Sequence, residues 1–222
     1  MMERNLEPVK PRRSYNAAQR RAQARATRRA VLDTAGQLFA ARGYGRTSMR
    51  DIAAAAGVSV ETLYGYFRTK AGLLKELLDV TVAGDDEPVA VSDRAPIQAI
   101  RSDPDGRGKL TRYAAFLSQV QARLAPLFQV IRGAADADES VAMLWAELGD
   151  QRLAGMTMFA EHLAAAGLLA PGLTVEAARD ELWALGAAEV YHLLVCQRGW
   201  SPDRYRDWLA EVWASRLLAE PG

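Results

Sequence analysis

Two short helices joined by a tight turn at Gly57-Val58 constrain the fold of this chain more than any other feature of its sequence. Ser48 is a favoured helix N-cap residue, and Asp51 stands three residues later, which is the spacing of a capping box. Gly57 supplies the left-handed residue that ends a helix, and Ser59 then caps the next one. A short capped helix, a tight turn and a second short helix are the parts of a helix-turn-helix, so the sequence predicts that motif here.

Longer helices are expected on both sides of the motif. Residues 16–42 are rich in Ala, Gln and Arg and carry one apolar face. Gly43 is expected to end this helix and to let Tyr44 fold back onto Phe39. A further helix with a leucine-rich stripe is expected to begin at Lys70 and to end before the next glycine.

The composition changes after residue 84, where a stretch rich in Asp, Pro and Gly predicts a loop with one short helix at most. Long Ala- and Leu-rich segments follow, and strand signals are absent. The expected helices there are 110–132 with a break at Pro126, 139–166, 175–197 and 202–218. The sequence thus predicts an all-α protein with a flexible basic arm (1–26), a three-helix helix-turn-helix domain (27–75) and a larger helical domain (76–222).

The charge of the chain is divided between its two parts. The whole chain has a net charge of +1, but residues 1–75 hold fifteen Lys and Arg against five Asp and Glu. Their net charge is therefore +10, and that of the remaining residues is −9. Such a division indicates a part that binds a polyanion, joined to an acidic part with another task.

The spacing of the motif resembles that of the DNA-binding region of the TetR family of regulators. The resemblance covers residues 31–78 and is carried by Ile52-Ala53, Ala56-Gly57-Val58-Ser59, Leu63-Tyr64, Phe67 and Lys70. It implies a second helix that enters the major groove, with phosphate contacts from the helix starts. The implied DNA-contacting residues are Thr47, Ser48, Ser59, Val60, Glu61, Thr62, Tyr64, Gly65, Tyr66 and Lys70. Charge and position add Arg46 and Arg50 as further phosphate contacts.

Two departures from the family pattern bear on the DNA sequence that is bound. Val60 and Glu61 stand where family members often carry a basic or small residue, which favours a contact between Val60 and a thymine methyl group. The second departure is an arginine-rich N-terminal extension that either adds salt-dependent DNA contacts or remains a solvated tail. Its arginines are Arg12, Arg13, Arg20, Arg21, Arg25, Arg28 and Arg29.

The resemblance also implies a homodimer that forms a four-helix bundle from the last two helices of each copy. The apolar stripes of residues 175–197 and 202–218 are compatible with such an interface. A two-fold dimer presents two recognition helices one DNA turn apart, so the expected operator is a near-palindrome.

The helices before the dimer interface are expected to enclose a pocket for a small-molecule effector. The candidate lining residues are aromatic, Met or His side chains, the types that an apolar or aromatic effector meets. They are Tyr113, Phe116, Phe128, Trp145, Met156, Phe159, His162, Trp183, Tyr191 and His192. Plain core packing is the alternative role for each of them. A repressor released by its ligand is the family's commonest arrangement, while an activator, a corepressor-dependent regulator and a dimer without effector stay open.

Several classes of protein are disfavoured by what the sequence lacks. Two histidines, one cysteine, and no Gly-rich phosphate loop or nucleophile motif argue against an enzyme, a metal site and a bound cofactor. The single cysteine fits a reducing cytoplasm. The sequence has no apolar stretch long enough for a membrane span, so no membrane partner is expected.

Overall fold

The computed structural model describes residues 12–219, and the secondary structure of that range is helical apart from one isolated bridge between Leu169 and Leu218. The N-terminal helices are α1 (Arg12–Arg42), α2 (Met49–Ala56), α3 (Val60–Phe67) and α4 (Lys70–Ala83). A 3₁₀ turn (Val91–Asp93) leads to α5 (Ala95–Ser102), α6 (Gly106–Ala135) and α7 (Glu139–Ala165). The chain ends with α8 (Val175–Leu185), α9 (Ala188–Tyr191), a π-helical turn (His192–Gln197) and α10 (Pro202–Leu217). The prediction of an all-α protein is confirmed for this part of the chain.

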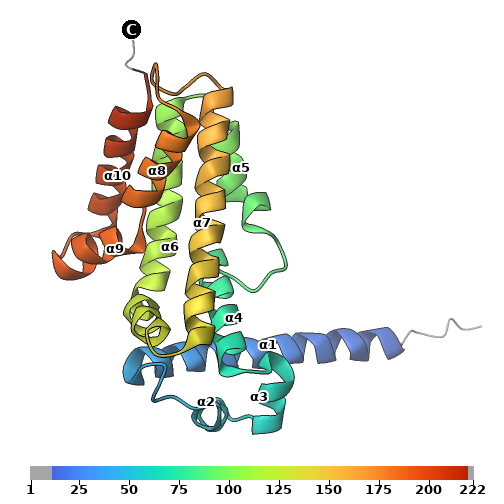
Figure 1. Ribbon diagram of the computed structural model, residues 1–222. Coiled ribbons are helices and arrows are strands. Elements are labelled where there is room, and N and C mark those ends of the chain that lie inside the picture. The colour runs from blue at the N-terminus through green and yellow to red at the C-terminus, as the bar shows by residue number, and fades with distance from the viewer. Residues whose placement is uncertain (1–11, 220–222) are drawn as a thin grey trace, which may run out of the picture.

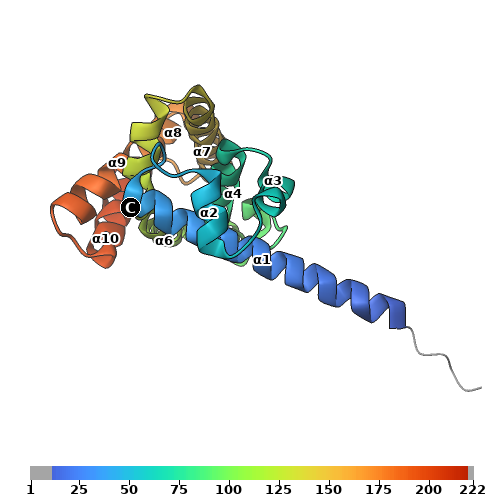
Figure 2. The same cartoon turned by 90° about the horizontal axis from the view of Figure 1, so that it is seen from below.

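The helices form an upright bundle that stands on a smaller base (Figure 1). Helices α6, α7, α8 and α10 run along the bundle, while α1 crosses beneath it and α2 and α3 lie at its lower end. The view from below shows that the first turns of α1 extend beyond the rest of the molecule (Figure 2). No helix within residues 12–219 is long and apolar enough to cross a membrane.

The helix-turn-helix is held by a core that it shares with the bundle. Phe39 of α1, Ile52 of α2 and Leu63 of α3 are fully buried in this core, together with four leucines of α4. Leu127 of α6 and Val141 of α7 belong to the same cluster. The expected domain boundary at residue 75 therefore differs from the packing, because it falls inside α4 and the core continues across it.

A second core lies further up the bundle, where α10 packs along α6. Tyr205, Leu209, Trp213 and Leu217 form the buried stripe of α10, and each is inaccessible to solvent. These side chains were expected to face a partner copy, but they are buried within the protomer. The fully buried residues of α10 therefore pack against other helices of the same chain.

The helix ends follow the local signals of the sequence. Ser48 and Asp51 form the complete capping box, and Gly43 and Gly57 have φ angles of +81° and +67°. The rings of Phe39 and Tyr44 meet with their centroids 5.4 Å apart, as the glycine stop predicted. Thr174 and Ser201 cap α8 and α10.

Three expectations about helix boundaries were wrong. Helix α1 begins at Arg12, four residues before the expected start at residue 16, so residues 12–26 of the expected flexible arm are helical, while residues 1–11 lie outside the described range. Helix α6 continues through Pro126, so the expected break does not occur there. The single helix expected over 175–197 is interrupted at Gly186, whose carbonyl accepts a hydrogen bond from the Gln121 amide at 3.1 Å.

Candidate functional site

The outer face of α3 is exposed to solvent. Leu63 and Phe67 are buried against the core, so the opposite side of this helix faces solvent. Glu61, Thr62 and Gly65 are exposed, and Tyr64 has an exposed fraction of 48%. This face carries an acid, a hydroxyl and a phenol, which are groups that can hydrogen-bond to base edges.

Two of the expected α3 contacts are less available than their neighbours. Val60 and Tyr66 are partly buried and pack against the core, and the Tyr66 ring lies 5.9 Å from that of Phe67. Ser59 is exposed, and its hydroxyl accepts the Thr62 backbone N–H at 3.1 Å. Among the expected residues of this helix, Glu61, Thr62, Tyr64 and Gly65 are therefore the accessible group.

Thr47 and Lys70, two of the expected phosphate contacts, make hydrogen bonds within the protein. The Thr47 side chain is buried, its hydroxyl donates to the Gly43 carbonyl at 2.9 Å, and its N–H donates to Tyr44. The Lys70 ammonium donates to the carbonyls of Tyr44 (3.0 Å) and Thr47 (3.2 Å) and lies 4.0 Å from the Tyr44 ring centroid. Burial lowers the pKa of Lys70. Both residues fix the turn that leads into α2.

The remaining expected phosphate contacts are exposed near the start of α2. Ser48 donates its hydroxyl to Asp51 at 2.6 Å, and these hydrogen bonds hold the pKa of Asp51 below its usual value. Arg46 and Arg50 are exposed, and the Arg46 Nε donates to the Arg42 carbonyl at 2.8 Å. These two arginines place positive charge beside the helix start, where phosphate oxygens bind favourably.

The arginines of α1 are only partly available to a polyanion. Arg28 is paired with Glu76 of α4, and Arg29 with Asp33 at 3.0 Å. Arg25 lies 4.0 Å from Asp86, so three of the arginines expected to meet DNA already face a carboxylate. Arg12 and Arg13 are in the first turn of α1, and Arg20 and Arg21 lie on its exposed part.

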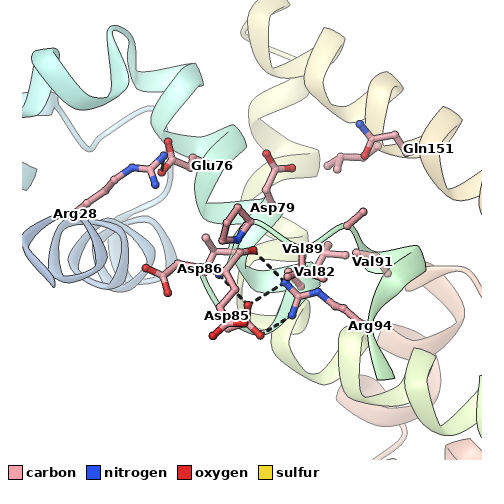
Figure 3. A pocket seen from close by; sticks show the side chains of 16 residues that line it. Arg28, Glu76, Asp79, Val82, Asp85, Asp86, Val89, Val91, Arg94 and Gln151 are labelled. Atoms are coloured by element: carbon pink, nitrogen blue, oxygen red, sulfur yellow. Dashed lines mark hydrogen bonds and ion pairs between the residues drawn. The ribbon is translucent and has the colours of Figure 1, made fainter. Parts of the chain in front are cut away.

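An acidic pocket of about 400 Å³ lies where the helix-turn-helix meets the bundle (Figure 3). Arg94 holds the segment after α4 in place, since its two terminal nitrogens donate to the Asp85 carboxylate at 2.5 and 2.9 Å. Figure 3 shows Asp79 of α4 and Gln151 of α7 on opposite sides of this pocket. Lys75 of α4 also pairs with Glu147 of α7 at 2.7 Å. Helix α4 is thus tied both to the helix-turn-helix and to the bundle.

The bundle encloses a second and larger space, a cavity of about 790 Å³ between α4, α5, α6, α7, α8 and α9. Eight of the ten side chains expected to line a pocket do line this cavity. They are Tyr113, Phe116, Phe128, Trp145, Met156, Phe159, His162 and Trp183. The large cavity also touches Val82 near the end of α4, and Val82 lines the acidic pocket as well.

The other two expected lining residues lie elsewhere. Tyr191 is buried against Tyr205 of α10, with ring centroids 4.9 Å apart. The His192 Nε2 shares a hydrogen bond of 2.9 Å with the Gln129 amide, outside the set of lining residues. The chain turns at Gly186, whereas the expected helix over 175–197 is continuous.

Polar residues of the large cavity were missed from the sequence. Arg152 of α7 lines it, donates to the Trp183 carbonyl at 2.6 Å and lies 4.5 Å from the Trp183 ring centroid. Burial lowers the pKa of Arg152. Glu189, Gln121 and Arg101 also line the cavity. Arg152 is the only Lys or Arg of α7, which is the one sequence signal that could have identified it.

Comparison with known protein families matches residues 31–77 to the model of the bacterial regulatory proteins of the tetR family. The chain is 40% identical over 57 residues to the HTH-type transcriptional regulator TtgR of Pseudomonas putida, and 37% identical over 59 residues to AcrR of Shigella flexneri. The TtgR match covers 26% of this chain, the AcrR match covers 27% of it, and each match spans 27% of its relative. The family model therefore covers the helix-turn-helix with parts of α1 and α4, and each relative matches about a quarter of this chain.

Solved structures extend the likeness of the fold to the bundle. The structure of NalD, the secondary repressor of the MexAB-OprM multidrug efflux pump in Pseudomonas aeruginosa, superposes with a TM-score of 0.64. The superposition covers 90% of this chain and all of NalD, at 23% sequence identity. The two proteins therefore share an arrangement of helices.

Proposed function

We propose that the chain is a regulator of the TetR family, a dimeric repressor whose operator binding is weakened by a small molecule in the large cavity. The observation that carries the proposal is the link between two sites by one helix. Helix α4 packs under the helix-turn-helix through Leu73 and Leu74 and lines the large cavity through Leu78 and Val82. The proposal places the protein in the cytoplasm with the DNA that it regulates.

The DNA-binding part of the proposal is supported by the exposed face of α3. Thr62 and Tyr64 stand on this face without a structural role in the core, while the buried face is fixed by Leu63 and Phe67. A helix held so rigidly on one side presents its other side to the major groove in a defined register. Arg46 and Arg50 then supply phosphate contacts that position the helix.

A dimer is needed for the operator that we propose. Two copies related by a two-fold axis present their α3 helices one DNA turn apart, which selects a near-palindromic site. The bundle has exposed apolar side chains outside its two cores, among them Leu153 and Met158 of α7 and Leu193 of the π-helical turn. Burial of such side chains against a second copy stabilises an interface.

Effector action follows from the position of α4. A ligand that binds one orientation of α4 better than another shifts the population of the two by its difference in affinity. A coupling of about 1–3 kcal/mol changes operator affinity about 5- to 150-fold. Repression is favoured because NalD, which shares the fold, is a repressor.

The rival function is a DNA-binding dimer without an effector. A cavity of about 790 Å³ argues against it, because a domain that serves only for dimerisation gains stability from a filled core. An activator or a corepressor-dependent regulator uses the same two sites with the opposite sign of coupling.

Selection of DNA from a random pool at near-physiological salt tests the proposal. The wild-type protein should enrich a near-palindrome, and a variant with Thr62→Ala and Tyr64→Ala should lose that enrichment while it keeps its helical content and melting temperature. Both side chains are exposed, so their truncation leaves the core intact. A control variant with Thr174→Ala, at the far end of the bundle, should select the same sequence as the wild type.

The selection separates two ways of failing. If neither the wild type nor the control enriches a sequence, the protein is not a sequence-specific regulator and the proposal is wrong. If the double variant enriches the same palindrome as the wild type, the protein reads DNA through another surface and α3 is not its recognition helix.

A further inference from the structure

The large cavity is mostly apolar, but the few charged side chains in it are mainly cationic. Arg101 and Arg152 line it, and Glu189 is the one carboxylate among the lining residues that the structure describes. Lys109 does not line the cavity, but it is buried beside it, and its ammonium shares a hydrogen bond of 2.9 Å with the lining residue His162. The surroundings of the cavity therefore carry an excess of positive charge.

Arg152 lines the cavity and has N–H groups beyond the one that donates to the Trp183 carbonyl. Its guanidinium has five N–H donors, of which the structure uses one, toward the Trp183 carbonyl. Within residues 12–219 it has no carboxylate oxygen within 4.0 Å, although Glu189 also lines the cavity. The Trp183 ring fixes the plane of the guanidinium from one side. A partly buried arginine held in this way is prepared for a planar anionic group.

Apolar and aromatic side chains line the cavity around Arg152. Tyr113, Met156 and Phe159 lie near it on α6 and α7, and the Tyr113 hydroxyl is already bound to the Met156 sulfur at 2.9 Å. Ile97 and Ile100 of α5 line another part of the cavity. A ligand that fills this space needs an apolar body, and desolvation of that body stabilises binding.

We propose that the effector is an amphipathic organic anion whose carboxylate or similar acidic group binds Arg152 and whose apolar body fills the large cavity. This inference rests on the proposed function and adds the chemical class of the effector. Glu189 is expected to disfavour the anion, so that its removal strengthens binding. A neutral ligand of the same shape is expected to bind less tightly, because it leaves the arginine without an anionic partner.

Three probes of equal chain length test the proposal without DNA: decanoate, 1-decanol and decylammonium. Binding to the purified protein is measured by titration calorimetry and by the fluorescence of the tryptophans, two of which, Trp145 and Trp183, line the cavity. Decanoate should bind most tightly and decylammonium least. Arg152→Gln should weaken decanoate binding about 10- to 100-fold, and Glu189→Gln should strengthen it.

Two further variants keep the result interpretable. Arg152→Lys retains the charge without the planar fork and should recover part of the affinity for decanoate. Arg198→Gln removes an exposed arginine outside the cavity and should leave all three affinities unchanged. Circular dichroism and melting temperature show whether each variant is folded.

The inference is overturned if decanoate binds no more tightly than 1-decanol, or if Arg152→Gln weakens both probes equally. Because the probes are measured on the protein alone, a failed operator selection does not affect this result. A positive probe result with a failed selection would support the anion site and contradict the proposed sequence-specific DNA binding.

Discussion

The base of the molecule has a filled core, whereas the bundle above it encloses a cavity of about 790 Å³. In the base, Phe39, Ile52 and Leu63 meet from three helices and are fully buried. In the bundle, Phe116 is partly buried and Trp183 has an exposed fraction of 40%, and both side chains line the cavity. Rigid packing suits a surface that must hold a fixed register on DNA, and open space suits a site that must admit a ligand.

The largest expected difference between the two regions concerns removal of an aromatic ring. Phe39→Ala should lower the free energy of unfolding by about 3–5 kcal/mol, because it leaves a void in a closed core. Phe116→Ala should lower it by about 1–2 kcal/mol, since that ring is only partly buried beside existing space. Urea denaturation measures both values. Equal losses would show that the cavity is filled by packing and would contradict the comparison.

Substitution of two glycines by alanine should change the stability by smaller amounts and in opposite directions. A Cβ at Gly186 would lie 2.7 Å from Leu117 and 2.8 Å from the Leu182 carbonyl, so Gly186→Ala should cost about 1–3 kcal/mol. A Cβ at Gly155 of α7 meets nothing within 4 Å, so Gly155→Ala should stabilise by about 0.5–1 kcal/mol. Gly155 lines the large cavity, so this substitution should also reduce the space for a ligand. Thermal denaturation of the two variants gives the sign, and a stabilised Gly186→Ala protein would show that the break in this helix is not required.

Loss of a helix cap at either end of the molecule should lower stability by a similar amount, but only one of the two caps should affect DNA binding. Ser59 caps α3 and Thr174 caps α8, each by accepting one backbone N–H. Replacement of either by Ala should destabilise the protein by about 0.5–2 kcal/mol. Only Ser59→Ala should also weaken operator binding, which a mobility-shift titration measures. Equal effects of the two variants on DNA would mean that global stability, and not the start of α3, controls binding.

The smallest expected effect is the change in stability when His162 in the bundle becomes protonated. Burial and then the nearby Lys109 charge lower the pKa of His162 below its ordinary value. Neutral His162 therefore contributes stability that is present above pH 6.5, about the unfolded pKa, and is lost as the pH falls through the lower folded pKa. Proton NMR resolves the imidazole, because the chain has two histidines. Lys109→Met should raise the pKa of His162, and an unchanged value would show that the ammonium does not act on this ring.

The sequence by itself determined the features that depend on neighbours along the chain. Ser48 with Asp51, Gly57 and Ser59 define two helices through hydrogen bonds that span three to five residues, and the structure has each of these helix ends as predicted. The exposed face of α3 followed from the same local pattern, because Leu63 and Phe67 fix which side is buried. Aromatic residues on the bundle helices also indicated most of the cavity lining.

Only the tertiary structure decided the features that depend on contacts between distant segments. The Gln121 amide reaches the Gly186 carbonyl from 65 residues away and accompanies the break that turns Tyr191 and His192 from the cavity. The Thr47 hydroxyl and the Lys70 ammonium make hydrogen bonds within the protein, and the carbonyls that bind the ammonium lie 23 to 26 residues before Lys70. Arg152 is a candidate anion-binding residue because α8 places the Trp183 ring beside its guanidinium. Local hydrogen bonds can be read from the spacing of residue types, whereas which polar group meets which across the bundle depends on how the helices pack.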